Sequence, residues 1–174
     1  MNYKRELIAI IVLLLAAAIV SAQKPVKFTS VYTTLSGKDC KVLRGGPGTD
    51  DATECKGVGG YNVEVYYSAA TMQIGAIRRR DEQIVPIATL NLDFNYSQSR
   101  LEWRLANGKP FAVLMRVPRY GQPKEGEYFG DVLGQQIIVA GLVGYDINEK
   151  IDAKQIAANA KAREAADKAF MRRK

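Results

Sequence analysis

The 174-residue chain contains no histidine. Histidine is the commonest general base and metal ligand, and it is the side chain that usually titrates near neutral pH. Its absence excludes Ser-His-Asp and Cys-His catalysis. The chain also lacks a Gly-x-Ser-x-Gly motif, a Walker loop and a Gly-x-Gly-x-x-Gly that opens a helix. These absences favour a non-catalytic protein over an enzyme and leave catalysis by paired carboxylates open, and we expect neither a cofactor nor a metal.

Long hydrophobic runs are scarce, and the one at the N-terminus has the features of a secretory signal peptide. Lys4 and Arg5 precede an unbroken apolar run over residues 7–20, and Val20-Ser21-Ala22 places small residues at the two positions that a signal peptidase inspects. The run is shorter than the roughly 20 residues that span a bilayer. We predict a signal peptide over residues 1–22 that is cleaved before Gln23, with no transmembrane segment after cleavage. Since no cysteine follows the run directly, a lipid-anchored lipoprotein is not expected. Cleavage lowers the formal net charge from +7 to +6, because two basic residues and one acidic residue are lost.

Cysteine is equally scarce, and both cysteines lie in the exported part. An even count in an oxidising compartment predicts one disulfide between Cys40 and Cys55. The residues between them, 45–51, are rich in glycine and contain Pro47, so we expect an irregular loop fastened at its base. A metal or catalytic role for the two thiols is the less favoured alternative, since such sites need further ligands.

The residues that follow favour strands. Tyr61–Ser68 alternates apolar and polar side chains, as a strand covered on one side does. Asn107-Gly108 predicts a hairpin turn whose first strand places Leu101, Trp103 and Leu105 on one face. Pro86 limits its strand to an edge or a bulge. The expected strands cover residues 28–35, 61–68, 72–77, 83–92, 100–106, 111–117, 128–133 and 135–142. Residues 23–151 are therefore predicted to form a mainly β domain, an antiparallel sandwich or barrel of about seven or eight strands.

Residues 152–174 change character and predict a C-terminal α-helix. Asp152 and Gln155 resemble a capping box, and the segment contains neither glycine nor proline. Glu164 and Lys168 form a well-oriented i,i+4 pair. One face carries only alanines, so we expect intrinsic propensity to hold the helix more than docking does. These alanines are Ala158, Ala162, Ala165, Ala166 and Ala169.

Arginines supply the main candidate binding groups. Three consecutive arginines cannot all point inward from a strand, so some are exposed and able to bind phosphate or carboxylate groups. A solvated turn is the alternative interpretation of this run. Nucleic acid is not an expected partner, because no reader motif is present. The candidate anion-binding residues are Arg78, Arg79, Arg80, Arg104, Arg116 and Arg119.

The acidic residues give weaker hypotheses. Glu64 and Glu102 alternate with core positions, so both are expected to face solvent, and Glu102 is expected to pair with Arg104 on its own strand. Asp50, Asp51 and Glu54 are expected to form a solvated acidic turn, because they lack the spacing of a calcium loop. Asn95 begins a glycosylation sequon that matters only in a eukaryotic secretory pathway.

Four patches of the sequence resemble a family of small exported bacterial proteins of unassigned function. The resemblance spans most of the mature chain and implies export, the disulfide and a bacterial envelope setting, but no activity. The patches are Ser30-Val31-Tyr32-Thr33 leading to Asp39-Cys40-Lys41; residues 55–61; Glu102-Trp103-Arg104 with residues 112–116; and residues 159–167.

Three functional hypotheses follow from these observations. The leading one is a non-catalytic binding domain, periplasmic or secreted, whose partner is an anionic component of the envelope. The second is an inhibitor of a secreted hydrolase such as lysozyme, which would have to contact that cationic enzyme through residues 50–54. The third is a carboxylate-based hydrolase that uses a pair of acidic side chains, of which Glu102 would be one.

The signal-peptide assignment predicts the N-terminus of the exported protein. Mass spectrometry of the protein recovered from outside the cytoplasm should give Gln23 as the first residue. A protein that keeps residues 1–22 would show that the apolar run serves as an anchor.

Overall fold

The computed structural model describes residues 25–44, 52–68, 71–91, 99–127 and 129–172. The predicted signal peptide, residues 45–51 between the cysteines and the Asn95 sequon lie outside the described residues.

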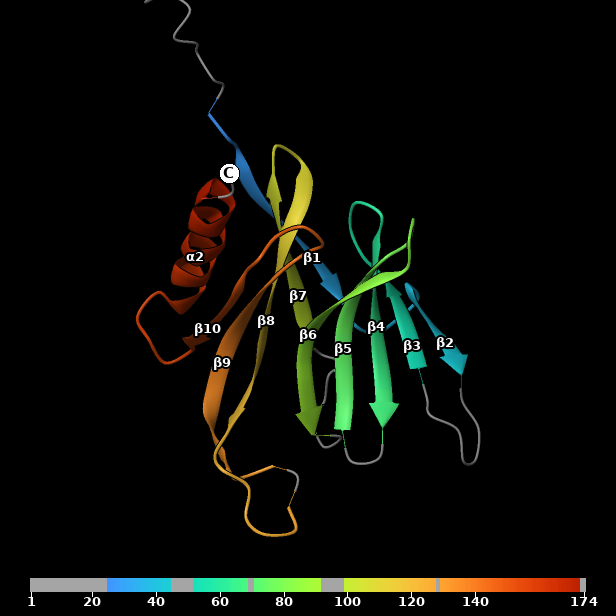
Figure 1. Ribbon diagram of the computed structural model, residues 1–174, viewed down its shortest axis with the longest axis vertical. Helices are drawn as coiled ribbons and strands as arrows, with labels where there is room; N and C mark the ends of the chain where they lie inside the picture. The colour runs from blue at the N-terminus through green and yellow to red at the C-terminus, as the bar shows by residue number, and fades with distance from the viewer. Residues whose placement is uncertain (1–24, 45–51, 69–70, 92–98, 128, 173–174) are drawn as a thin grey trace, which may run out of the picture.

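The described strands form two antiparallel five-stranded sheets, which confirms the mainly β sandwich with a C-terminal helix (Figure 1). The first sheet has the order β1 (Phe28–Thr34), β7 (Arg100–Ala106), β8 (Lys109–Tyr120), β9 (Val132–Gly141) and β10 (Asn148–Asp152). The second has the order β2 (Cys40–Arg44), β3 (Ala52–Lys56), β4 (Tyr61–Ser68), β5 (Thr71–Arg78) and β6 (Gln83–Asn91). The sequence missed β2, β3 and β10 because these strands have only five residues each and lack a clear alternation of apolar and polar side chains.

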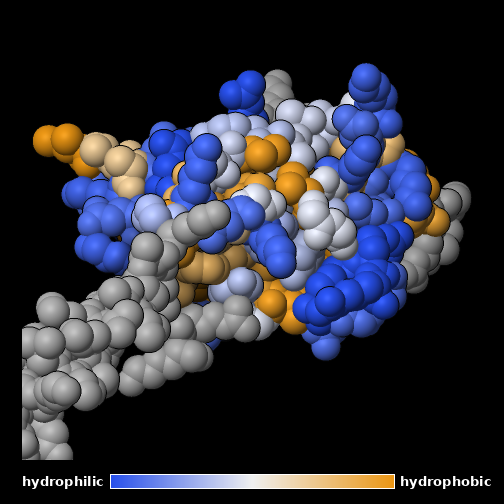
Figure 2. All heavy atoms as spheres, turned by 90° about the horizontal axis from the view of Figure 1, so that it is seen from above, coloured by the Kyte–Doolittle hydropathy of each residue, from blue (hydrophilic) through white to orange (hydrophobic). Residues whose placement is uncertain are grey.

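The core between the sheets contains the residues that the strand patterns placed there. Leu101, Trp103 and Leu105 are buried together with Val63 and Val65 of the facing sheet. The Trp103 indole is fully buried, and its Nε1 donates to Thr33 Oγ1 at 2.8 Å, so its polar group is satisfied. Seen from above, hydrophilic side chains alternate on the surface with small groups of hydrophobic ones (Figure 2).

The strand register confirms two local sequence signals, one at a turn and one at a proline. Ala106 pairs with Lys109, so the hairpin loop has two residues, and Asn107 and Gly108 take φ values of 50° and 81°. Positive φ at both central positions is the requirement of a type I′ turn. Pro86 lies on β6, an edge strand, next to the register shift of the β5–β6 pair.

The helix begins later than predicted. Asp152 is the last residue of β10, and its Oδ1 accepts a hydrogen bond from the Lys154 amide at 2.9 Å in a tight turn. The helix α2 covers Ala158–Arg172, directly after Ala157, whose φ is 56°. The capping box at Asp152 was therefore wrong, because this residue is used by the sheet and by a local turn instead.

α2 is docked on the face of the first sheet that points away from the second sheet (Figure 1). Ala158, Ala162 and Ala166 are buried against this face, and their small side chains allow a close approach. Phe170 adds the bulk that the alanines lack, with its ring centroid 4.8 Å from that of Phe111. The expectation that propensity outweighs docking missed this aromatic contact.

The predicted disulfide joins Cys40 to Cys55, which lie directly opposite each other on β2 and β3. The bond indicates an oxidising, extracytoplasmic environment. Among the described residues, no helix is both long enough and apolar enough to cross a membrane.

Removing the disulfide should destabilise the domain. We expect Cys40→Ala with Cys55→Ala to lower the free energy of unfolding by about 3 kcal/mol, because the unfolded chain gains loop freedom. Urea denaturation followed by Trp103 fluorescence measures the change. Reduced wild-type protein, which keeps both sulfur atoms but lacks the bond, is the control. An unfolding midpoint that is unchanged in both the variant and the reduced protein would contradict the prediction.

Candidate functional site

The six predicted arginines do not form one site. Arg78, Arg79 and Arg80 lie at the β5–β6 turn of the second sheet, whereas Arg104 and Arg116 lie on the helix-covered face of the first sheet. Arg119 lies further along β8, where its Nη2 is 3.9 Å from Asp152.

The arginines of the β5–β6 turn are engaged by acids of the same turn. Arg78 binds both carboxylate oxygens of Asp81, and this hydrogen bond holds the pKa of Asp81 below its usual range. Arg79 contacts Glu82 at 2.9 Å and Glu54 at 2.8 Å. Arg80 is exposed and lies 3.8 Å from Asp81. The solvated-turn interpretation therefore describes these residues better than an anion site does.

Glu54 is not part of a solvated acidic turn. It lies on β3, its side chain is 3% exposed, and it contacts Lys41 at 3.1 Å as well as Arg79. The expectation was wrong because the residues just before and after Cys55 form the strand β3, which starts at Ala52. On this strand, Glu54 is covered by two basic side chains. Asp50 and Asp51 lie outside the described residues.

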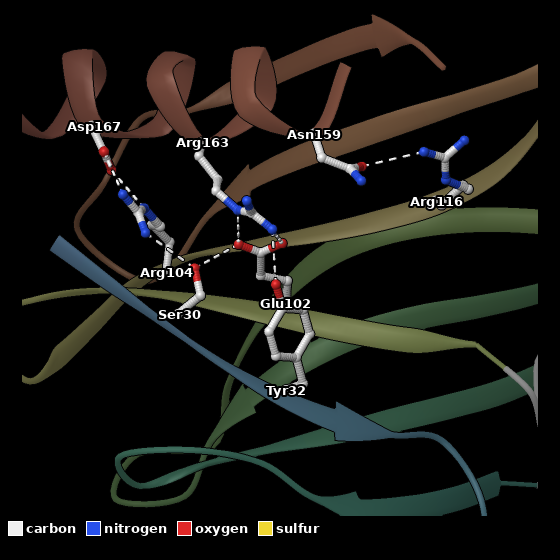
Figure 3. Close-up of polar contacts among 8 residues, drawn as sticks. All are labelled: Ser30, Tyr32, Glu102, Arg104, Arg116, Asn159, Arg163 and Asp167. Atoms are coloured by element: carbon white, nitrogen blue, oxygen red, sulfur yellow. Dashed lines mark hydrogen bonds and ion pairs between the residues drawn. The ribbon is translucent and has the colours of Figure 1, made fainter. Parts of the chain in front are cut away.

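Arg104 attaches the helix to the sheet. Its Nε and Nη2 donate to Asp167 Oδ1 and Oδ2 at 2.8 and 2.6 Å, and its Nη1 donates to Ser30 Oγ at 3.0 Å (Figure 3). The guanidinium also lies over the Phe28 ring, 5.6 Å from the centroid. Its acidic partner is thus Asp167 of α2 and not Glu102 of its own strand, so the predicted surface pair was wrong.

Glu102 is buried, contrary to expectation, with 8% of its surface exposed. Arg163 of α2 donates to its two oxygens at 2.6 and 3.0 Å, and Ser30 Oγ donates at 2.6 Å. The Nη2 of Arg163 also donates to the Tyr32 hydroxyl at 2.8 Å (Figure 3). The strand pattern placed Glu102 on the correct face of the sheet, but that face is covered by a helix and not by water.

These contacts decide the charge state of the pair. Burial alone would raise the pKa of Glu102, but the hydrogen bonds from Arg163 and Ser30 outweigh it and hold the pKa below its ordinary value. The hydrogen bond to Glu102 in turn raises the pKa of Arg163. Glu102 is therefore an ionised, fully engaged carboxylate and does not offer the protonated acid of a glycosidase pair.

A groove with a volume of about 540 Å³ lies on this face, beside the N-terminal end of α2. Its floor includes the buried side chains of Leu114 and Ile137. Its rim is polar and carries three arginines from three different elements, and we call it the arginine groove. The rim residues used below are Tyr32, Arg100, Arg116, Gln135, Asn159 and Arg163.

The charges of the arginine groove are unequally compensated. Arg163 is neutralised by Glu102, whereas within the described part of the chain Arg116 contacts amide oxygens alone, those of Gln135 at 3.4 Å and Asn159 at 3.2 Å. Arg100 is exposed and has no ion-pair partner among the described residues. The first turn of α2 contains no acidic side chain, so the positive end of its dipole adds to the field. The groove is therefore cationic.

The sequence identified Arg116 but missed Arg100 and Arg163. Two signals could have found them. Arg100 shares a strand face with Glu102 and Arg104 by simple alternation, and Arg163 follows Asn159 by four residues, which places both on one face of a helix. The sequence pattern could not show that the helix docks beside β7 and β8.

The Glu102–Arg163 contact predicts a pH-dependent stability. Because the pKa of Glu102 is lowered on folding, its contribution is complete above the unfolded pKa, about 4.3, and is lost as the pH falls through the folded value. We expect Glu102→Gln to lower the free energy of unfolding by about 2 kcal/mol at pH 7 and by progressively less below pH 4. Urea denaturation between pH 7 and pH 3 measures both proteins.

Glu164→Gln is the matched control, since Glu164 is 60% exposed and pairs with Lys168 along the helix. It should change stability by less than about 0.5 kcal/mol. A deficit of Glu102→Gln that stays constant down to pH 3 would contradict the role of the ionised pair.

The comparisons with known proteins add no assignment. The resemblance to small exported bacterial proteins therefore stays a prediction, and the function has to be inferred from the groove. No protein-family model, no curated protein and no solved structure matches the chain.

Proposed function

We propose that the protein is a non-catalytic binding domain of the bacterial envelope, periplasmic or secreted, that takes an anionic ligand in the arginine groove. The observation that carries this proposal is the pair of arginines, Arg100 and Arg116, which line one hollow without an acidic partner among the described residues. Two cations that line the same hollow attract an anion, and no acidic side chain among the described residues competes for them.

Arg116 is prepared for this role by its neighbours. Its contacts with Gln135 and Asn159 lie at the long end of hydrogen-bond distances, and both acceptors are neutral. A carboxylate or phosphate oxygen offers the guanidinium a shorter, charge-assisted hydrogen bond. The two amides thus orient Arg116 without competing strongly for it.

Arginines that already have a carboxylate partner are weaker candidates for an anion site. Arg78 and Arg79 of the β5–β6 turn and Arg104 beneath the helix already bind carboxylates. The alternative of a hydrolase inhibitor relied on an acidic contact surface, and Glu54 is buried under Lys41 and Arg79. The hydrolase alternative relied on a free acid such as Glu102, which is engaged by Arg163.

Cosedimentation tests the proposal. We expect the exported chain to sediment with purified anionic envelope material at low salt and to be released at high salt, because exposed charges are screened beyond about 8 Å at physiological ionic strength. Arg116→Gln should weaken binding about tenfold, as the loss of one charge-assisted hydrogen bond does.

Arg80→Gln is the control, since it removes the same charge from a side chain that is 75% exposed at the β5–β6 turn. It should leave binding nearly unchanged. Equal weakening by both substitutions would point to the net charge of the protein, and binding that survives high salt would contradict the proposal outright.

A further inference from the structure

A second hollow, of about 420 Å³, adjoins the arginine groove. It is lined by the C-terminal half of β1 and by residues next to the disulfide, among them Asp39 and Lys56. Tyr32 and Arg100 line both hollows. Because they share these two residues, the two hollows adjoin at the edge strand β1, and we call them together the path; Arg116 lines its first hollow and Lys56 lines its second.

Tyr32 stands where the two hollows meet. Its side chain belongs to an edge strand and is 49% exposed, yet its hydroxyl is held by Arg163, which is itself fixed by Glu102 (Figure 3). The ring is therefore exposed and already oriented, so little side-chain entropy remains to be lost on binding. An oriented aromatic face offers a packing surface to the C–H face of a sugar ring, while the polar edge of the ring stays hydrated.

The polar groups along the path differ at its two ends. In the arginine groove, Arg100 and Arg116 lie beside the amides of Gln135 and Asn159 and pair with no acid that the structure describes. In the second hollow, Asp39 balances the charge of Lys56, so this hollow offers both acceptors and donors beyond the shared Arg100. An acid group fits the first end, and hydroxyl groups fit the second.

We propose that the ligand is an extended saccharide that carries an acid group. One sugar ring packs on Tyr32, its acid group is bound by Arg100 and Arg116, and the following neutral units run into the hollow beside Asp39 and Lys56. This inference rests on the proposed function and adds the chemical class and the minimum size of the ligand. A free anion would fill only the arginine groove and would leave Tyr32 without a role.

Calorimetric titration of the exported chain with four probes tests this inference. The probes are a tetrasaccharide of alternating glucuronate and N-acetylglucosamine, free glucuronate, the neutral tetramer of N-acetylglucosamine, and inorganic phosphate. We expect the acidic tetrasaccharide to bind at least about tenfold more tightly than glucuronate, and the neutral tetramer to bind more weakly than the acidic one.

Variants distinguish the contribution of the Tyr32 ring to binding from that of the Arg116 charge. Tyr32→Ala should weaken tetrasaccharide and glucuronate binding about tenfold and leave phosphate binding unchanged, whereas Tyr32→Phe, which keeps the ring, should bind both saccharides within about threefold of wild type. Arg116→Gln should weaken the binding of all three anionic probes. Thermal unfolding of each variant shows whether it folds, and Tyr32→Phe keeps the test valid if Tyr32→Ala does not.

The outcomes separate this inference from the proposed function. If glucuronate or phosphate binds as tightly as the tetrasaccharide and Tyr32→Ala has no effect, the saccharide inference is wrong and the anion site stands. If the tetrasaccharide does not bind while envelope material still sediments in an Arg116-dependent way, the ligand belongs to another anionic class. If neither binds, both proposals fail.

Discussion

The contact between Glu102 and Arg163 ties three elements of the molecule together. It joins β7 to α2 directly and reaches β1 through Ser30 and Tyr32. A carboxylate this deeply buried is tolerated only with such partners, because removing either one leaves an uncompensated charge in a poorly hydrated place. The position of the helix, and with it the shape of the outer face of the first sheet, depends on this pair.

A second pair gives the helix its register. Arg104 of the strand binds Asp167 of the helix, while Glu102 of the strand binds Arg163 of the helix, so the polarity is reversed between neighbouring pairs. Residues 163 and 167 are one helical turn apart. Sliding α2 by one turn would bring Arg163 to Arg104, or Asp167 to Glu102, and like charges would meet. The alanine stripe alone would not discriminate between these positions, since a methyl group fits equally well one turn away.

The arginine groove is a consequence of this placement. α2 packs on β8, β9 and β10 and leaves the Arg100 and Tyr32 end of the same face uncovered. Since Glu102 is fully used by Arg163, it does not neutralise Arg100 or Arg116. The interaction that positions the helix thus also leaves the groove cationic, and it orients Tyr32 at its rim.

Local signals in the sequence predicted most of the fold. The alternation in β4, the Asn107-Gly108 turn and the position of Pro86 each follow from backbone chemistry within a few residues. Alternation assigns Glu102 to a face, however, and cannot say what covers that face, so its burial and its partner on α2 were missed. Asp152 failed as a helix cap for a related reason, because β10 pairs with β9 and captures it. Among the three arginines of the groove, the sequence identified Arg116 alone. Arg100 and Arg163 become candidates only once the docking of the helix beside the strand is known.

The order of the strands also has a consequence for how the chain becomes folded. The second sheet is a continuous meander from β2 to β6, so each of its strands pairs with a neighbour in sequence. β1 instead pairs with β7, and the whole second sheet lies between them along the chain. Such distant pairings close late, because a long loop must be ordered before they form. Tyr32 on β1 therefore reaches its place only after β7 has been synthesised, so the face that carries the arginine groove is completed late in folding.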